Sequence, residues 1–306
     1  MLADLLVTTL AALGLGLAPP APPAETIAFV RGNQVFTARV DGTDAVARLR
    51  TRIGFTDVAF DGRGRLYASE GGSFYGDMCD VRAAGRDEPI VRFGDIVNVV
   101  RSESALCHIA RDSDRGLIFA AGSVPEGGES VWRLDPASKR VAPIASGYHP
   151  TMSGDGRRLV VVQHRTRAGG GTYETLAAGT PGRATSFSRI VPVPPKSAKV
   201  NYAFPSLSPD GQRLAALRVT GPLARLRWTI VVGRPGGQLR PVWGVNDRRR
   251  LGRIAWPRGG RALLVYSFDP RRGSPKGGGE LLRVPLEGSE PTAVLDDLTE
   301  FALRLD

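Results

Sequence analysis

Apolar positions along the chain come in short runs that alternate with polar residues, and a glycine, proline, aspartate or asparagine ends most runs. β-Branched and aromatic residues dominate these runs, which is typical of strands joined by tight turns. Beyond residue 20, no stretch repeats apolar residues at i, i+3, i+4 and i+7 without a glycine or proline interrupting it. With 38 glycines and 23 prolines among 306 residues, the composition favours many turns over long helices. The pattern predicts an all-β protein.

Two segments carry the same pattern of residues. PTMSGDGRRLVVV (150–162) and PSLSPDGQRLAAL (205–217) share Pro, Ser, Asp-Gly, Arg and Leu at the same offsets. Asp-Gly is a hairpin-turn pair, because glycine supplies a positive φ without steric cost. Each segment therefore reads as strand, tight turn, strand. Weaker copies lie at 57–68, 108–120 and 254–266.

Further strands follow the copies and complete a larger unit. Examples are SVWRLDPAS (130–138), WTIVVGRPGG (228–237) and LLRVPLEG (281–288), each followed by one more short apolar segment. Four strands per unit and a period of 40 to 55 residues predict the blades of a β-propeller. The 282 residues from 25 to 306 give 47 per blade for six blades. We therefore expect one six-bladed domain; seven blades would require a hidden unit within 163–204.

The last residues of the chain, FALRLD (301–306), alternate apolar and polar positions like a half-buried strand. The domain opens at TIAFV (26–30), which reads as a later strand of a blade whose first strand is missing. We expect the C-terminal strand to complete that blade, because this closes the ring and removes two exposed sheet edges.

The turns SPDGQRL (208–214) and SGDGRRL (153–159) resemble the S-P-D-G-[KR]-x-[IL] turn of the WD40-like (PD40) repeats in TolB-like β-propellers. The resemblance covers the whole ring in outline and is carried by two blades. It implies a propeller of four-stranded antiparallel blades. It also implies an exported protein that docks protein partners at one end of its central channel.

The N-terminal segment reads as an export signal. LLVTTLAALGLGLA (5–18) is apolar apart from two threonines, and small residues and prolines follow it. Fourteen residues are too few to span a bilayer core of roughly 30 Å, but they fit the apolar region of a signal peptide. We predict a signal peptide over 1–24, and a mature domain over 25–306 that lacks a transmembrane span and resides in the periplasm or outside the cell.

The chain has two cysteines, Cys79 and Cys107. An isolated pair in an exported protein favours a disulfide, worth about 3 kcal/mol for a loop of this length in the chain-entropy model. The alternative is two separate buried thiols, which cysteine tolerates well.

The formal net charge is +11, which suggests an anionic partner. Only four of the 41 basic residues are lysines, however, and the arginines are spread through all segments, as in proteins from GC-rich genomes. Aromatic and basic residues do not interleave on successive strands, as a base-stacking surface would require. We therefore expect a protein or an anionic cell-envelope component as partner rather than nucleic acid, and a monomeric chain.

No local motif predicts catalysis, a cofactor or a metal. A G-x-S-x-G nucleophile turn is absent from the sequence, and so are the common zinc spacings and phosphate-binding loops. The three histidines are His108, His149 and His164. The first two begin or precede the first strand of a unit, so we expect a structural or surface role for them.

Two functions from different classes remain open. The first is a non-catalytic binding propeller whose mouth loops hold the partner. The mouth candidates are Tyr75, Tyr148, Tyr202, Trp243, Arg248, Arg249 and Arg250. The second is a hydrolase of the propeller lactonase or phosphodiesterase type, with a calcium ion held in the channel by side chains of different blades. The asparagines that lie before or between strands are Asn33, Asn98, Asn201 and Asn246. Convergence of three or more acidic or asparagine side chains in the channel would favour the hydrolase.

Overall fold

The structure is a computed structural model of the chain. It describes residues 25–71, 79–100, 108–112, 116–122, 129–166, 170–183, 187–193, 200–222, 225–246, 249–272 and 278–304. The predicted signal segment 1–24, Tyr75, Cys107 and Arg248 lie outside these ranges. No helix in the described part of the chain is both long and apolar enough to cross a bilayer.

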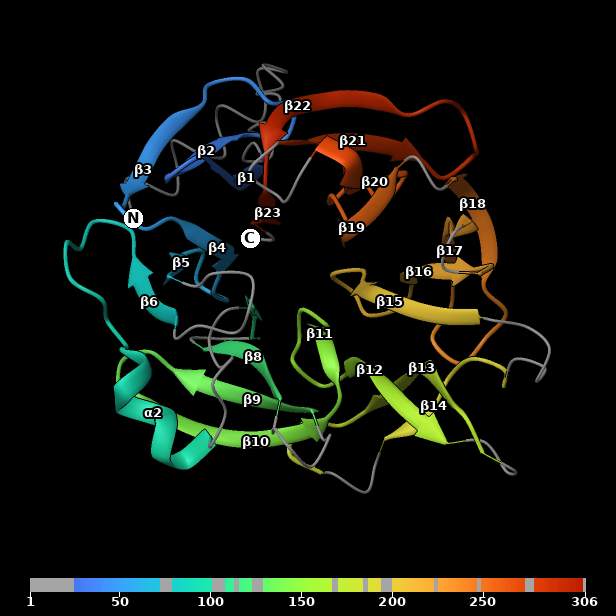
Figure 1. Ribbon diagram of the computed structural model, residues 1–306, viewed down its shortest axis with the longest axis horizontal. Coiled ribbons are helices and arrows are strands. Elements are labelled where there is room, and N and C mark those ends of the chain that lie inside the picture. The colour runs from blue at the N-terminus through green and yellow to red at the C-terminus, as the bar shows by residue number, and fades with distance from the viewer. Residues whose placement is uncertain are drawn as a thin grey trace, which may run out of the picture.

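Six antiparallel sheets surround a common axis, which confirms the six-bladed all-β propeller (Figure 1). Blade 1 consists of β23 (Glu300–Leu303), β1 (Thr26–Arg31), β2 (Gln34–Arg39) and β3 (Val46–Arg50). Blade 2 consists of β4 (Phe55–Phe60), β5 (Leu66–Gly71) and β6 (Cys79–Ala83). Blade 3 consists of β7 (Ile109–Arg111), β8 (Leu117–Gly122), β9 (Glu129–Asp135) and β10 (Arg140–Ser146).

Blade 4 consists of β11 (Tyr148–Met152), β12 (Leu159–Thr166), β13 (Thr172–Gly179) and β14 (Ser188–Arg189). Blade 5 consists of β15 (Val200–Leu207), β16 (Leu214–Thr220), β17 (Arg227–Gly233) and β18 (Arg240–Val245). Blade 6 consists of β19 (Arg250–Ala255), β20 (Ala262–Phe268), β21 (Gly279–Pro285) and β22 (Thr292–Leu298). The segment that a seventh blade would have needed is divided between blades 4 and 5.

Two short helices complete the described elements: α2 (Phe93–Val100) and the 3-10 helix η3 (Pro270–Arg272). Blade 2 has three described strands, and Val91 extends it by an isolated antiparallel bridge to Val81. The helix α2 follows this bridge and lies beside β10, outside the ring (Figure 1).

The C-terminal strand closes the ring, as the sequence predicts. β23 pairs antiparallel with β1, with Phe301 opposite Phe29 and Ala302 opposite Ala28. Phe301 is fully buried in a cluster that also contains residues of blade 6. The closing strand therefore joins the last described strand of the chain to the first.

The apolar side chains form six core clusters, and each cluster fills the space between two neighbouring blades. This arrangement follows from strands that alternate their side chains between two faces, because each blade has a neighbour on both faces. Tyr202 and Trp243, two of the mouth candidates, contribute to these interfaces. Tyr202 belongs to the core cluster between blades 4 and 5, and Trp243 packs on the cluster between blades 5 and 6.

The repeated turn also ties neighbouring blades together. Gly156 and Gly211 adopt φ angles of 69° and 68°, as an Asp-Gly turn requires. The arginine two residues further on donates to the turn of the next blade: Arg158 to the Gly211 carbonyl at 3.1 Å, and Arg213 to the Gly260 carbonyl at 2.6 Å. The shared Arg of the two best repeats is therefore a link between blades.

Candidate binding site at the propeller axis

The innermost strands of the six blades are β23, β4, β7, β11, β15 and β19 (Figure 1). One or two positions after each inner strand comes a residue that pairs with the start of the second strand or closes the turn toward it. These residues are Asp61, Asp112, Ser153, Ser208, Pro257 and Arg304. The residue four positions earlier falls in, or directly before, the inner strand. These six residues, which we call the axial ring, are Asp57, His108, His149, Phe204, Arg253 and Glu300.

Short contacts connect most members of the axial ring to their neighbours. Arg253 donates to the Asp57 carboxylate at 2.7 Å and lies 3.4 Å from the Glu300 carboxylate. The Nδ1 atom of His108 lies 3.9 Å from the Asp57 carboxylate. On the other side of the ring, His149 stacks on Phe204 with their ring centroids 4.0 Å apart. Residues spread over most of the sequence therefore meet at one level of the axis.

The guanidinium of Arg253 is the centre of the charged half. Besides the two carboxylates, it donates to the carbonyls of Val58 and Phe301 at 3.0 Å each and of Ile109 at 3.2 Å. These three carbonyls belong to the inner strands of blades 2, 1 and 3. One side chain from blade 6 thus bonds to the inner strands of three other blades, which uses the planar fork of donors that only arginine offers.

Asp57 is held from several sides as well. Its side chain is fully buried, and it accepts from the backbone N–H of Val58 at 2.6 Å and of Ile109 at 3.0 Å. Burial is the main reason that the pKa of Asp57 rises to about 6 and that of Glu300 to about 7, although Arg253 opposes both shifts. Two carboxylates share one guanidinium, so one of them takes up a proton near neutral pH.

These pKa values predict how stability depends on pH. Between about pH 4.5 and 7 the folded protein holds a proton that the unfolded chain has lost, so unfolding releases it and the free energy of unfolding falls as pH rises through this window. Between these two pH values, we expect the free energy of unfolding of the wild type to fall by about 1–3 kcal/mol more than that of the Glu300→Gln variant. Urea denaturation at pH 4.5, 6 and 7.5 measures this, with Glu287→Gln as the exposed control. Parallel curves for wild type and Glu300→Gln would contradict it.

The uncharged half of the axial ring has unusual backbone geometry. His149 and Phe204 both have φ of 45°, in the left-handed region that non-glycine residues rarely adopt. Both fall within β-bulges of their inner strands, between Tyr148 and Thr151 and between Ala203 and Ser206. A bulge re-aims a side chain, and strained residues of this kind are concentrated at functional sites. Burial lowers the pKa of His149 to about 3, so its imidazole is neutral.

Among the mouth candidates predicted from the sequence, Tyr148 borders this site. Tyr148 lies next to His149 at the start of β11, with their rings 4.8 Å apart. Arg249 forms an ion pair with Glu280 at 2.6 Å, and Arg250 is exposed at the start of β19. The binding roles proposed for the mouth candidates stay predictions, as does the disulfide. Cys79 is buried and is not a free thiol.

Four members of the axial ring were not predicted from the sequence: Asp57, Phe204, Arg253 and Glu300. A signal was present, because each ring residue stands four positions before the residue that closes its turn. It could have been found by aligning all six inner strands on their turns. The residue types differ from blade to blade, so a search for recurring residues passes over them.

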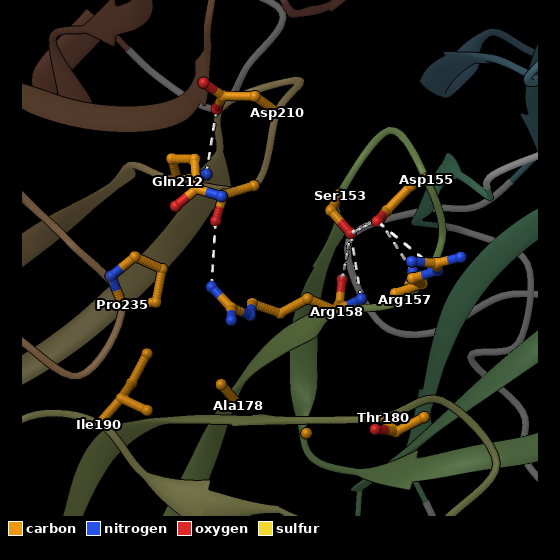
Figure 2. A pocket seen from close by; sticks show the side chains of 12 residues that line it. Ser153, Asp155, Arg157, Arg158, Ala178, Thr180, Ile190, Asp210, Gln212 and Pro235 are labelled. Atoms are coloured by element: carbon orange, nitrogen blue, oxygen red, sulfur yellow. Dashed lines mark hydrogen bonds and ion pairs between the residues drawn. The ribbon is translucent and has the colours of Figure 1, made fainter.

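A hollow lies beyond the turn ends of the inner strands, between the turns of blades 4 and 5 (Figure 2). Its volume is about 470 Å³ and its lining includes Asp155, Arg158 and Asp210. Its polar groups already form hydrogen bonds within one turn or between the two turns. Asp155 accepts from Ser153 of the same turn at 2.6 Å, and Arg158 donates to Gly211 of the next blade. The hydrogen bond from Ser153 lowers the pKa of Asp155. This groove is therefore built mainly from turn-stabilising contacts.

No protein-family model matches the sequence, and no curated protein matches it. Among solved structures, TolB from Acinetobacter baumannii aligns with 97% of this chain and 71% of its own, with a TM-score of 0.63 and 14% identity. Hydrazine synthase from Kuenenia stuttgartiensis aligns with 82% of this chain and 71% of its own, with a TM-score of 0.50 and 13% identity. The periplasmic gluconolactonase of Pseudomonas aeruginosa reaches a TM-score of 0.46 at 13% identity, over 91% of this chain and 98% of that one. At these identities the likeness shows a TolB-like propeller fold and nothing further.

Proposed function

We propose that this chain is an exported, non-catalytic binding propeller that docks a protein or cell-envelope partner at the end of the axis where the axial ring lies. The TolB-like fold supports a binding role, because the sequence resemblance implies docking at one end of the propeller. The apolar segment at 5–18 supports export.

The observation that carries the proposal is the position of Arg253 between Asp57 and Glu300. A channel-metal hydrolase needs carboxylates that are open to a cation. Here both carboxylates of the axial ring are bound to a guanidinium from a third blade. Among the described residues, no three His, Cys, Asp or Glu side chains are grouped to hold a metal ion. Asn33, Asn201 and Asn246 are exposed and lie outside the axial ring. The ring is thus better suited to holding its own blades in place and presenting a surface than to binding calcium.

Site-specific photo-cross-linking tests the docking site. A photoreactive amino acid replaces His108, whose side chain is 72% exposed, in the full chain expressed in its native cell. The matched control places the same group at Arg157, an 89% exposed side chain at the opposite end of the strands. We expect an envelope partner to be captured from position 108 and not from position 157.

Two results would overturn the proposal. One is equal capture from both positions, which would indicate non-specific contact. The other is a purified chain that carries a stoichiometric divalent metal and hydrolyses a lactone or phosphodiester. Export has its own test: a periplasmic reporter fused after residue 30 should be active, and deletion of residues 5–18 should abolish its activity.

A further inference from the structure

A row of rings leads away from the axial ring along the start of blade 4. His149 is in edge contact with Tyr148, and Tyr148 stacks on His164 with their centroids 5.1 Å apart. Together with the stacking of His149 on Phe204, this gives four rings in series. We call His164, Tyr148, His149 and Phe204 the aromatic track. It begins at the axis and ends at His164, which is exposed on β12.

Two carboxylates accompany the track. Glu174 lies on β13 directly opposite His164, and Glu129 begins β9 in the neighbouring blade. His164 stacks on Tyr148, which places Glu174 beside this ring, and the Glu129 carbonyl accepts from the N–H of Gly147 at 2.7 Å. Burial is the main cause that raises the pKa of Tyr148, and a hydrogen bond with Glu174 and the charges of both carboxylates add to it. Burial also raises the pKa of Glu129, and Glu174 adds to that shift. Two negative groups from different blades therefore face the same ring.

Neither carboxylate forms an ion pair within the described part of the chain. The Oε2 atom of Glu129 is buried and accepts no hydrogen bond there, and no ion pair joins Glu129 or Glu174 to a described basic residue. Arg165, the nearest arginine along β12, donates to Gln163 at 2.6 Å instead. This contrasts with the axial ring, where Arg253 satisfies both acids.

Two buried polar atoms at this place lack a hydrogen-bond partner, Glu129 Oε2 and His149 Nδ1. A buried polar atom without a partner costs about 1–3 kcal/mol, so two of them beside the same tyrosine indicate a group that is supplied from outside. That group must donate hydrogen bonds to carboxylates and lie flat against rings.

We propose that Glu129, Glu174 and the aromatic track bind an arginine side chain of the docked partner. The guanidinium is planar, carries five donors and stacks on aromatic faces, which matches two carboxylates beside a row of rings. A local acidic site on a chain of net charge +11 also makes binding selective, because other basic surfaces are repelled. This inference rests on the proposed docking function and names the chemistry of the partner.

The test uses arginine amide as the probe and citrulline amide as the uncharged probe of nearly the same shape. Binding to the full chain is followed by calorimetry or by NMR shifts of Glu129 and Glu174. We expect arginine amide to bind at least tenfold more tightly than citrulline amide. The Glu129→Gln/Glu174→Gln variant should lose at least tenfold in affinity for arginine amide. The Glu287→Gln/Glu290→Gln variant, which removes two exposed carboxylates near the β21–β22 turn, should keep the wild-type affinity.

Each outcome decides the inference. Equal affinity for the two amides, or wild-type affinity in the Glu129→Gln/Glu174→Gln variant, would overturn it. A thermal melt confirms that each variant is folded; if the double variant melts early, the single variant Glu174→Gln takes its place. The peptide acetyl-Gly-Gly-Arg-Gly-Gly-amide should bind at least as tightly as arginine amide, because the proposed arginine is part of a partner chain. Weaker binding of the peptide would overturn the proposal that the arginine comes from a polypeptide.

The same variants separate this inference from the docking proposal. In the cross-linking experiment from position 108, loss of capture in the Glu129→Gln/Glu174→Gln variant supports both. Unchanged capture in that variant would overturn the arginine site and leave the docking proposal standing. Glutamate-dependent binding of arginine amide without capture of any partner would count against the docking proposal alone.

Discussion

Replacing Arg253 with methionine is expected to lower the free energy of unfolding by about 3–5 kcal/mol, because the change leaves two buried carboxylates without their counter-charge. Asp57 is fully buried and the Glu300 side chain is 17% exposed, so water replaces little of what the guanidinium supplies. The three carbonyls that accept from Arg253 lose their partner at the same time. Urea denaturation at pH 7.5, followed by tryptophan fluorescence, measures the loss.

A compensated variant separates the charge effect from the loss of packing. Arg253→Met combined with Asp57→Asn and Glu300→Gln removes both acids along with the base, and we expect it to recover most of the lost stability. Arg253→Lys should fall between the wild type and Arg253→Met, because an ammonium keeps the charge but cannot reach three carbonyls and two carboxylates together. A triple variant as unstable as Arg253→Met would show that buried charge is not the cause.

The second large effect is expected at the ring closure. Phe301→Ala should cost about 3–5 kcal/mol, because a fully buried ring is replaced by a cavity next to Phe29 and the core of blade 6. The loss acts on the pairing of β23 with β1, which is the contact that joins the two ends of the domain. For a domain of this size it corresponds to a fall in melting temperature of about 10 °C.

Differential scanning calorimetry measures that fall, and Ile53→Ala provides the control. Ile53 is also a large apolar residue, but it is 70% exposed, so its truncation should change the melting temperature by less than about 2 °C. An equal fall for both variants would mean that the closing strand adds no special stability. Unfolding in two steps for Phe301→Ala would instead show that the blades remain folded after the ring has opened.

The two predictions both involve β23, the first through Glu300 beside Arg253 and the second through Phe301. Glu300 and Phe301 are consecutive on β23, so one faces the charged axis and the other the apolar space between blades 6 and 1. A strand alternates its side chains between two faces, which allows one short strand to serve both. The closing strand therefore completes both the sheet and the axial ring.

The sequence alone determined the blades, because their signals are local. Asp-Gly in a turn and a short apolar strand depend on neighbouring residues, and the turns and the C-terminal strand both appear in the structure. The predicted alternation does not hold over the described part of that strand, because Ala302 is buried along with Phe301 and Leu303. The repeat also located Arg158 and Arg213, although it did not say that each reaches the next blade. The mouth candidates were chosen by residue type, and type does not tell whether an aromatic residue such as Tyr202 packs between blades or meets a partner.

Only the tertiary structure decided the candidate site. Asp57, Arg253 and Glu300 come from three blades and are far apart along the chain, so their meeting depends on the closure of the ring and on the common register of the inner strands. The same holds for Glu129 and Glu174, which approach one tyrosine from two blades. Local propensity sets strands and turns, whereas the charges and rings that share a site are chosen by contacts across the whole fold.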